Sequence, residues 1–546
     1  MKAPGSASVR GLWPAASDYR GLRRSWKGDL LAGATVGIVA LPLALAFGVS
    51  SGAGAASGLV TAIVAGVVAA VFGGSNVQVS GPTGAMVVVL APILAERGAG
   101  ALAAVCMLAG LFVLAAGLLR LGRTVGLIPW PVIEGFTLGI AVIIFLQQVP
   151  TATGTHPGSS TNAVIAAAQS IAAAEWPKVG WSLLLVALVV TVMLAGLRMH
   201  PRFPGSLVAI VVTSLLAAAL GLPVDTIGEL PAGLPAPTLP HLDLASLLAL
   251  AGPAAAVAAL AAIESLLSAR VASTLADTGS FDPDRELVGQ GLASLAAGLF
   301  GGMPATGAIA RTAVNVRAGA RSRVAAITHA VLLLAVALVG APVVSHIPLA
   351  ALAGVLLVTA CRMVAPATVR TVLRSTRADA VVFCLTAIVT VSVDLIYAVL
   401  IGLSAAAVFA LRQMARTSGV HREELPGPVH RGDERIAVFR LEGALFFGAA
   451  ERTMERVAGL RDVEVVVIRM SQLQILDATG AQVITGLITS LERRGITVLV
   501  KGIPPQHRAL AERVGVIASL RHQNHLFDDL DAAVAHARSH VARSGR

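Results

Sequence analysis

The chain has 546 residues, of which 56% are hydrophobic and only 13% are charged, and its mean hydropathy is +0.80. A soluble globular protein carries about 25% charged residues, so most of this chain is expected to lie in lipid. The net charge of +11 does not indicate a nucleic-acid partner, because aromatic residues make up only 4% and the arginines are dispersed among apolar runs. Basic loops of a membrane protein account for this charge.

The sequence shows no pattern of an enzyme or of a cofactor site. Its three cysteines lack metal-ligand spacing. Its Gly-rich pieces lack the strand–loop–helix context of a nucleotide-binding loop, and no nucleophile is grouped with a base. We therefore expect neither catalysis nor a bound cofactor.

From the N-terminus, residues 1–28 form a polar segment that we expect to be retained and cytoplasmic. Residues 29–413 are filled by apolar segments, each near the ~20 residues that a helix needs to cross hydrocarbon, or shorter. Arginines gather at alternate junctions, which favours both termini in the cytoplasm of a multi-pass protein of the cell membrane, as in a bacterial inner membrane. We predict fourteen segments, at 30–48, 55–73, 82–95, 99–119, 129–149, 179–197, 204–221, 249–270, 286–300, 305–316, 322–341, 347–364, 377–392 and 394–413.

The character of the chain changes after residue 413. We interpret 414–434, which is polar and contains proline, as a linker, and 435–546 as a soluble α/β domain with a basic tail. Runs typical of strands alternate there with runs typical of helices, which indicates a parallel sheet with crossover helices. The strands are predicted at 435–441, 463–470 and 496–503, and the helices at 448–458, 478–494 and 505–515.

Two distant stretches repeat one pattern, GPTGA at 81–85 and PATGA at 304–308. Each follows a Gly-Gly break, at 73–74 and 301–302, and each opens an apolar segment too short to span a bilayer comfortably. These segments are the third and the tenth, so each is third in a half of seven. Paired short helices of this kind are typical of transporters with inverted repeats, in which their N-termini point at one site near the membrane midplane.

A helix N-terminus presents unpaired N–H groups and a partial positive charge, so it favours an anion. We therefore predict an anion site at these two helix ends, in which the hydroxyls of Thr83 and Thr306 select the ligand. The alternative is a pair of ordinary helix breaks tolerated by packing. The predicted substrate-binding backbone belongs to Thr83, Gly84, Ala85, Ala305, Thr306, Gly307 and Ala308.

Glu264 is the acidic residue set most deeply in an apolar segment. An ionised carboxylate at the bilayer centre costs from ~2.5 kcal/mol upward, so it is expected to be protonated, paired or bound to a cation. Ser268 lies one helical turn later on the same face and could add an oxygen ligand for Na⁺. We prefer proton coupling, which needs only a carboxylate; a purely structural carboxylate is the alternative.

Arg311 stands one turn into the short tenth segment. Its guanidinium could add positive potential or donate to the bound anion. Alternatively, it extends to the cytoplasmic side or pairs with a carboxylate.

These residues carry a resemblance to the SulP family of sulfate and anion permeases, which includes prestin. The matching motifs are Val39–Pro42 with Ala46–Gly48, Gly73–Ser75 with Ser80–Ala85, Glu264–Ser268, and Gly301–Arg311. The resemblance implies fourteen segments in two inverted repeats, which form a core and a gate, with the anion held between the third and tenth half-helices and near Phe47. It also implies that Glu264 couples transport to H⁺ or Na⁺, that Arg311 lies near the anion, and that the protein forms a homodimer.

The resemblance further implies that the C-terminal domain is a STAS domain. Asp477 and Thr479 occupy the loop in which related antagonists of anti-sigma factors are phosphorylated, so Thr479 is a regulatory candidate; a purely structural domain is the favoured alternative. His522 and His525 have a possible ligand spacing, but we expect a final helix with a solvated end and no metal.

The family pattern has one departure, since Pro42-Leu43 replaces the Pro-Gln of many members. Together with Ala310-Arg311, it looks more like bacterial members that carry C4-dicarboxylates than like those that carry sulfate or bicarbonate. We predict secondary active transport of a small anion, by proton symport through an elevator-like movement. An exchanger, a Na⁺-coupled symporter or an anion channel of the same family is the alternative, and a nucleobase permease fits the anion motifs poorly.

Overall fold

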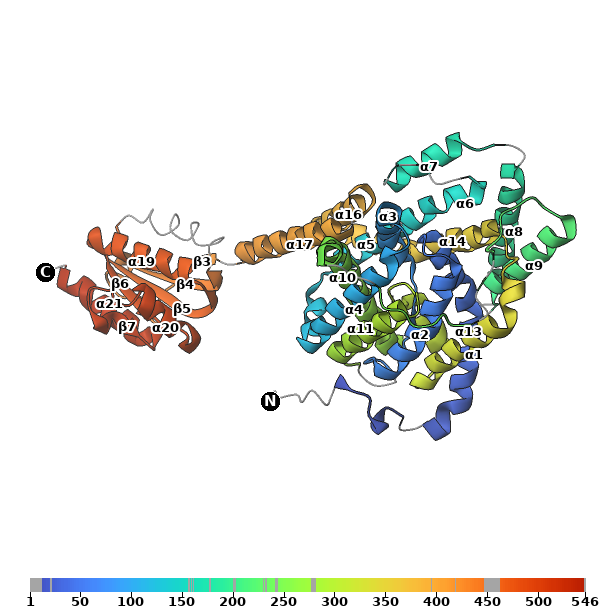
Figure 1. The fold of residues 1–546 in the computed structure, drawn as a ribbon. Helices are drawn as coiled ribbons and strands as arrows, with labels where there is room; N and C mark the ends of the chain where they lie inside the picture. The colour runs from blue at the N-terminus through green and yellow to red at the C-terminus, as the bar shows by residue number, and fades with distance from the viewer. Residues whose placement is uncertain are drawn as a thin grey trace. The chain divides into compact units, whose positions relative to one another are not determined.

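A computed structural model describes residues 12–19, 22–155, 158, 160, 162–175, 178–199, 203–228, 230, 233–240, 244–275, 281–393, 395–417, 419–445 and 462–544. The chain divides into two compact units, Met1–Leu403 and Ser404–Arg546. The first unit is a bundle of helices, and the second contains a five-stranded sheet (Figure 1).

Each of the fourteen predicted apolar segments contains a helix. Within the described residues, nine helical spans are long and apolar enough to cross a membrane, and two of them, Trp130–Thr153 and Leu349–Arg374, each run over two consecutive helices. The other predicted segments are shorter, and α3 and α12 have only 14 and 9 residues. The fourteen helices are α1 (Leu22–Ser50), α2 (Ala55–Phe72), α3 (Gly84–Arg97), α4 (Ala101–Leu118), α5 (Trp130–Gln147), α8 (Lys178–Met199), α9 (Gly205–Leu220), α10 (Leu244–Leu275), α11 (Pro283–Leu299), α12 (Ile309–Arg317), α13 (Arg323–Val344), α14 (Leu349–Met363), α16 (Arg377–Ser392) and α17 (Leu395–Thr417).

Shorter elements connect these helices. They are η2 (Ala16–Tyr19), η3 (Leu121–Leu127), α6 (Val149–Thr153), α7 (Ala163–Ala172) and α15 (Pro366–Arg374). Helix α7 begins where the Asn162 side chain accepts hydrogen bonds from two backbone N–H groups of its first turn, at 3.0 and 3.4 Å. The sequence did not predict α7 or α15 as segments, because neither is long enough to span a bilayer.

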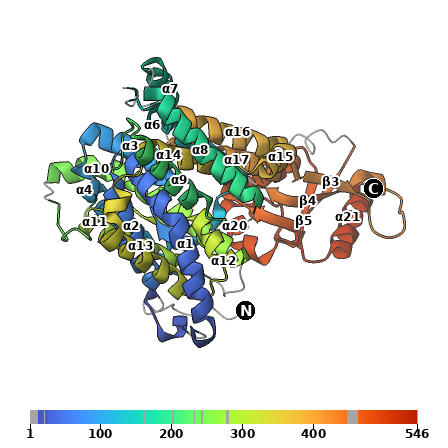
Figure 2. The same ribbon diagram turned by 90° about the vertical axis from the view of Figure 1, so that its right-hand side faces the viewer.

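Helix contacts repeat between the two halves of the first unit. Helix α1 packs against α13 as α10 packs against α4, and α2 packs against α13 as α11 packs against α4. Likewise α1 contacts α12 as α10 contacts α3, and α5 contacts α16 as α14 contacts α8. Helices α1, α2 and α13 lie side by side in both views (Figures 1 and 2). Each half therefore uses its third and fourth helices to contact the other half, as expected of a seven-plus-seven repeat.

These contacts form two bundles. The core bundle contains α1 to α4 and α10 to α13, and the gate bundle contains α5, α8, α9, α14 and α16. Small residues permit the close approaches: a Cβ atom on Gly58 of α2 would lie 3.0 Å from the Gly48 Cα atom of α1. The beginning of α3 lies where the bundles meet, because Ala85 and Met86 share a hydrophobic cluster with Ile140 and Ile144 of α5.

The N-terminal segment is fastened to the core bundle. Asp18 of η2 accepts two hydrogen bonds from the Arg285 guanidinium of α11, at 2.6 and 3.1 Å. Bidentate pairs of this kind are among the stronger charge-assisted contacts. Residues 12–19, which belong to the predicted cytoplasmic segment, thus pack against the helices.

The second unit holds a sheet of order β3-β4-β5-β6-β7. Strands β4 to β7 run parallel, and β3 pairs antiparallel with β4. The strands are β3 (Gly419–Glu423), β4 (Ile436–Leu445), β5 (Val465–Leu476), β6 (Thr497–Lys501) and β7 (Leu526–Phe527); the helices are α19 (Ala478–Arg493), α20 (Pro505–Val514) and α21 (Leu530–Ser544), with short 3-10 turns η4 (Asp433–Arg435) and η5 (Gln523–His525).

The side chains of β4 point alternately to the two faces of the sheet, and helices cover both faces. Ala437 and Phe439 pack with α19 and α20 in one hydrophobic cluster, whereas Ile436 and Val438 pack with α21 in another. Burial on both faces explains why these strands are almost continuously apolar.

Two predictions for this unit need comment. The predicted linker 414–434 contains a strand, β3, which the sequence did not indicate because an edge strand with exposed His421 and Arg422 has a polar pattern. The predicted helix at 448–458 lies outside the described residues.

Candidate functional site

The two repeated motifs meet. Ser80–Gly81 forms strand β1 and Thr306–Gly307 forms strand β2, and the two pair antiparallel with Ser80 opposite Gly307. Since α3 and α12 begin two or three residues later, both helices start at one place.

The motif glycines are required by close contacts. Gly81 has φ = 150°, and a Cβ atom there would lie 2.8 Å from Nη1 of Arg311. A Cβ atom on Gly307 would overlap the side-chain amide of Gln78. The chemistry at these positions therefore comes from the backbone and its neighbours.

Thr83 is the N-cap residue of α3, but its side chain does not cap the helix. Instead, the hydroxyl donates to Oε2 of Glu264 at 2.8 Å. The N–H groups of Gly84, Ala85 and Met86 fall in the first turn, where a helix supplies no acceptor. Phe47 of α1 is buried beside this turn, since its ring would lie 3.4 Å from a Cβ atom on Gly84.

At the second motif the protein itself uses most of the predicted donors. The N–H of Ala305 donates to Ser294 Oγ at 3.2 Å, that of Gly307 to Ser265 Oγ at 3.0 Å, and that of Ala308 to the Val79 carbonyl at 2.9 Å. The expectation that these three amides face an anion is therefore not met, because Ser294 of α11, Ser265 of α10 and the Val79 carbonyl next to β1 accept their hydrogen bonds. The amides without an intrahelical acceptor are those of the first turn of α12, residues 309–311.

Helix α10 contacts both motifs through consecutive residues. Glu264 accepts from Thr83, and Ser265 shares a hydrogen bond of 2.9 Å with the hydroxyl of Thr306, which also lies 3.3 Å from the Ala261 carbonyl. Both threonine hydroxyls thus bind protein groups in this structure, rather than standing free to select a ligand.

Ser268 is buried, but it binds α12 and not the Glu264 carboxylate. Its hydroxyl lies 3.1 Å from that of Thr312, which in turn accepts from the Val79 N–H at 3.0 Å. Ser268 therefore belongs to the contact between α10 and α12, and the expectation that it adds an oxygen ligand beside Glu264 is not supported by this geometry.

Arg311 crosses from the second motif to the first. It is 2% exposed, and its Nη2 donates to the Pro82 carbonyl at 2.5 Å. Nη1 has no hydrogen-bond partner among the residues that the structure describes. Because Arg311 is buried, it does not extend to the surface. Its positive charge and the negative charge of Glu264 attract each other. A buried cationic donor with unused capacity therefore lies between the motifs.

Sequence reasoning missed two buried polar residues at this site. The Gln78 side chain donates to the Ser265 carbonyl at 3.2 Å, and Ser265 joins the second motif as described above. The signals were present, because Gln78 is a polar residue between two valines just before β1, and Ser265 follows Glu264 directly.

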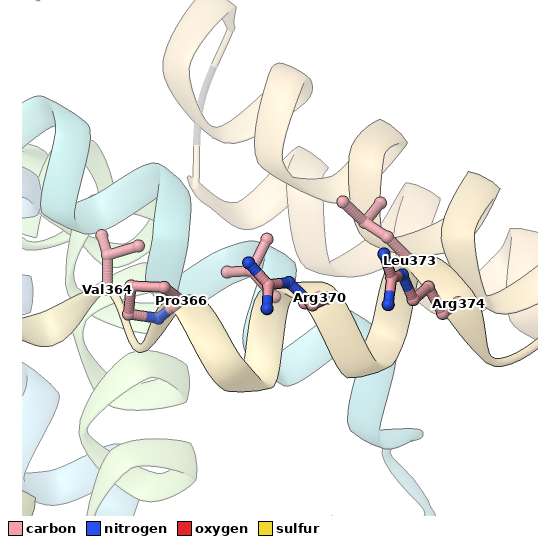
Figure 3. A pocket seen from close by; sticks show the side chains of 6 residues that line it. Val364, Pro366, Arg370, Leu373 and Arg374 are labelled. Carbon is pink, nitrogen blue, oxygen red and sulfur yellow. The ribbon is translucent and has the colours of Figure 1, made fainter.

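A shallow hollow lies elsewhere in this unit, along α15 (Figure 3). It has a volume of 410 Å³ and is lined by Val364, Pro366, Val369, Arg370, Leu373 and Arg374. Arg370 and Arg374 are one turn apart on one face of α15, beside apolar side chains, which suits a helix at the edge of the hydrocarbon. This surface contains none of the motif residues.

In the second unit, Asp477 caps α19, since its carboxylate accepts from the Gly480 N–H at 2.7 Å. Thr479 is exposed in the first turn of that helix, so a kinase could reach its hydroxyl.

Comparisons with known proteins cover nearly the whole chain. The model of the sulfate permease family matches residues 26–386, and that of the STAS domain matches 428–533. The provisionally named sulfate transporter YvdB of Bacillus subtilis is 34% identical over 521 residues, which are 92% of this chain and 96% of that protein. The bicarbonate transporter BicA of Synechocystis sp. is 30% identical over 542 residues, 94% of each.

Solved structures of anion transporters have a similar fold. The transmembrane domain of a cyanobacterial bicarbonate transporter BicA is 34% identical, with a TM-score of 0.60 over 70% of this chain and 97% of that one. The murine Slc26a9 anion transporter in its inward-facing state has a TM-score of 0.84 over 99% of this chain and 96% of that one; at 18% identity, it shows the fold alone. These findings confirm the predicted fold class, a membrane-spanning helical domain followed by a STAS domain. The named relatives are transporters, not enzymes.

Proposed function

Since the chain belongs to the sulfate permease family, we propose that it carries a small anion across the cell membrane by secondary active transport. One observation carries the proposal: two helix N-termini meet at β1–β2, and the buried Arg311 guanidinium lies between them with Nη1 unpaired in the described part of the chain. Each end contributes a partial positive charge and Arg311 a full one, so a bound anion neutralises the site.

The proposed anion position lies against the first turns of α3 and α12. The N–H groups of Gly84 and Ala85, and those of residues 309–311, can donate to it. Phe47 covers the α3 end and limits the size of the ligand. Backbone donors accept any small oxyanion, so the side chains nearby set the substrate class.

For the substrate we favour a carboxylate anion. Pro42-Leu43 and Ala310-Arg311 resemble members that carry C4-dicarboxylates, and Leu43 supplies no side-chain amide for sulfate. Bicarbonate is the second candidate, because a relative named for bicarbonate transport is 30% identical along 94% of the chain.

We further propose that Glu264 couples transport to protons. Its carboxylate accepts a hydrogen bond from Thr83 at 2.8 Å, and the opposite charge of Arg311 acts on it. An anion arriving beside this carboxylate adds a second negative charge, which favours protonation. Proton and anion then bind together, as a symporter requires.

The two bundles suit an elevator-like movement. The proposed site belongs to the core bundle, and its α3 end abuts Ile144 of the gate bundle. Movement of the core along the gate would carry the site from one side of the membrane to the other. We propose that both termini are cytoplasmic and that the protein works as a homodimer.

The test is uptake into proteoliposomes across an imposed pH gradient. We expect an inward proton gradient to drive accumulation, and Glu264→Gln to abolish the dependence on the gradient. Glu134→Gln is the matched control. Glu134 is a partly buried carboxylate of α5 that accepts a hydrogen bond from Trp130, and it is not part of either motif. Proton coupling through this residue would be contradicted if wild-type uptake did not depend on the gradient. It would also be contradicted if uptake by Glu264→Gln still depended on the gradient.

A competition panel tests the substrate. Fumarate, succinate, bicarbonate, sulfate and chloride are each added against a labelled dicarboxylate. Strong competition by fumarate and succinate supports the first candidate, whereas bicarbonate as the best competitor supports the second. Currents that far exceed carrier turnover would favour a channel instead.

A further inference from the structure

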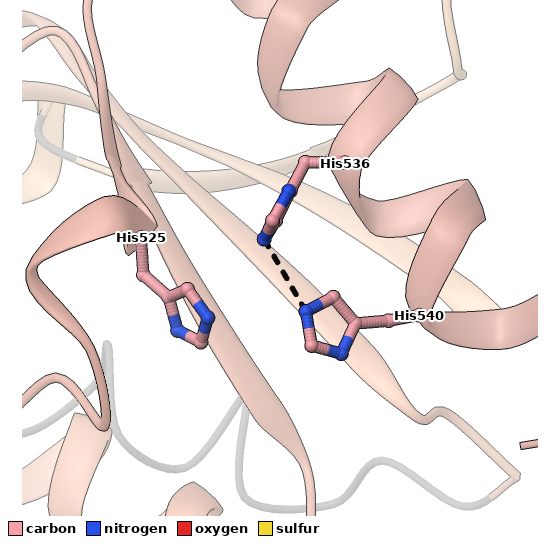
Figure 4. A group of neighbouring side chains, drawn as sticks. All are labelled: His525, His536 and His540. Atoms are coloured by element: carbon pink, nitrogen blue, oxygen red, sulfur yellow. Dashed lines mark hydrogen bonds between the residues drawn. The ribbon is translucent and has the colours of Figure 1, made fainter. Parts of the chain in front are cut away.

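Three histidines converge in the second unit. His525 ends η5, and His536 and His540 lie one turn apart on α21 (Figure 4). One ring nitrogen of each lies within 4.8 Å of those of the other two. The Nε2 atoms of His536 and His540 are 3.3 Å apart. These side chains approach from two elements that β7 separates in the chain.

The central ring is buried and incompletely satisfied. His525 is 2% exposed, and its Nδ1 has no hydrogen-bond partner among the described residues. A backbone hydrogen bond to Val498 of β6 holds the ring. Burying a polar nitrogen without a partner is unfavourable, so this atom has the capacity to bind an ion or a water molecule.

The donor set of the cluster suits a metal ion. Three imidazole rings converge from η5 and α21, and imidazole is the commonest side-chain ligand of metal ions in proteins.

The distance between the Nε2 atoms of His536 and His540 matches tetrahedral zinc coordination. In a tetrahedral zinc site, Zn–N distances of about 2.0–2.1 Å place two ligand nitrogens about 3.3–3.4 Å apart. The His536–His540 separation of 3.3 Å, which is a hydrogen bond in this structure, fits this value, and the third ring offers a nitrogen within 4.8 Å of the other two. The i, i+4 spacing on α21 also puts both rings on one helical face.

We propose that His525, His536 and His540 bind a divalent late transition-metal ion, Zn²⁺ first, with water as the fourth ligand. Three imidazoles suit Zn²⁺ or Cu²⁺ and do not suit Mg²⁺ or Ca²⁺, which prefer oxygen. The ion would fasten α21 to the sheet next to η5. From the sequence we expected no metal at His522 and His525; the proposed partners of His525 lie 11 and 15 residues later, on α21. This site is independent of the proposed transport.

The test uses the full chain purified with a non-histidine affinity tag and stripped of metal. Zinc is titrated against a chromophoric chelator, with His536→Gln and His540→Gln as the variants. Both side chains are partly exposed, so the substitutions should leave the fold intact. His421→Gln is the matched control, because His421 is exposed on β3 of the same sheet.

We expect one Zn²⁺ per wild-type chain, a loss of affinity of about 100-fold in each variant, and wild-type affinity in the control. Cobalt(II) gives a second measurement that requires no variant, since a tetrahedral site absorbs visible light strongly and an octahedral aqua ion weakly. Wild-type zinc affinity equal to that of His536→Gln and His540→Gln, or a weak octahedral cobalt spectrum, would overturn the proposal.

Discussion

Replacing Arg311 by methionine tests whether the buried guanidinium serves the anion. Methionine keeps much of the length of the side chain and removes the charge. Two unit charges 4–8 Å apart attract by about 2–4 kcal/mol at an effective dielectric constant of 20. Even the lower value corresponds to about a 30-fold loss of affinity, so we expect KM for the anion to rise by at least that factor.

The stability of the variant should change less than its affinity. The hydrogen bond from Nη2 to the Pro82 carbonyl contributes about 1.5–3 kcal/mol, as bonds to charged groups do. Removing the guanidinium also removes the cost of holding a cation 2% exposed, and protonation of Glu264 would relieve the charge that then lacks its partner, so these two changes offset part of that loss. Thermal unfolding in detergent, measured beside uptake, separates the two effects.

Arg317→Met is the matched control, because Arg317 ends the same helix and is exposed. Arg311→Lys adds a second comparison: it keeps the charge but loses the planar fork, so we expect an intermediate KM. The reasoning would be refuted if Arg311→Met kept the wild-type KM, or if Arg317→Met raised KM by the same factor.

Three further outcomes are expected. Gly307→Ala should sharply lower uptake and cost about 1–3 kcal/mol of stability, measured by thermal unfolding, because its Cβ atom would displace Gln78. Asp477→Ala should destabilise α19 by about 1 kcal/mol, seen as faster hydrogen exchange in its first turn, through loss of the cap. The hydrogen bond from Arg538 lowers the pKa of Asp433, so this pair stabilises the fold above pH 4 and loses its effect as the pH falls through the lowered pKa. Asp433→Asn should therefore speed exchange in α21 at pH 7, and this effect should shrink steadily as the pH is lowered below 4.

The sequence by itself was sufficient to predict the membrane helices. A span must be apolar over a length that the bilayer sets, and these two properties can be read locally along the chain. The predicted segments 377–392 and 55–73 therefore match α16 and α2 to within one residue. The two short helices were predictable for the same reason. A Gly/Pro break followed by a short apolar run can be recognised in the sequence without knowing which residues pack against it.

Edge strand β3 shows where local patterns fail. Its pairing with β4 depends on backbone hydrogen bonds to a strand that follows thirteen residues later, and its exposed side chains carry no apolar signal. The sequence thus indicated a linker where the tertiary structure has a strand.

The partners of the predicted site residues were decided by the tertiary structure alone. Thr83 and Glu264 are 181 residues apart, and Arg311 reaches Pro82 across 229. The sequence marked these residues as unusual, because polar groups in lipid are costly, but it could not say which donor meets which acceptor. In the folded chain, the hydroxyls of Thr83 and Thr306 bind residues of α10. His525 lies next to two histidines of α21, in addition to its sequence neighbour His522. Such pairings depend on the packing of distant helices, and no periodicity along the chain encodes them.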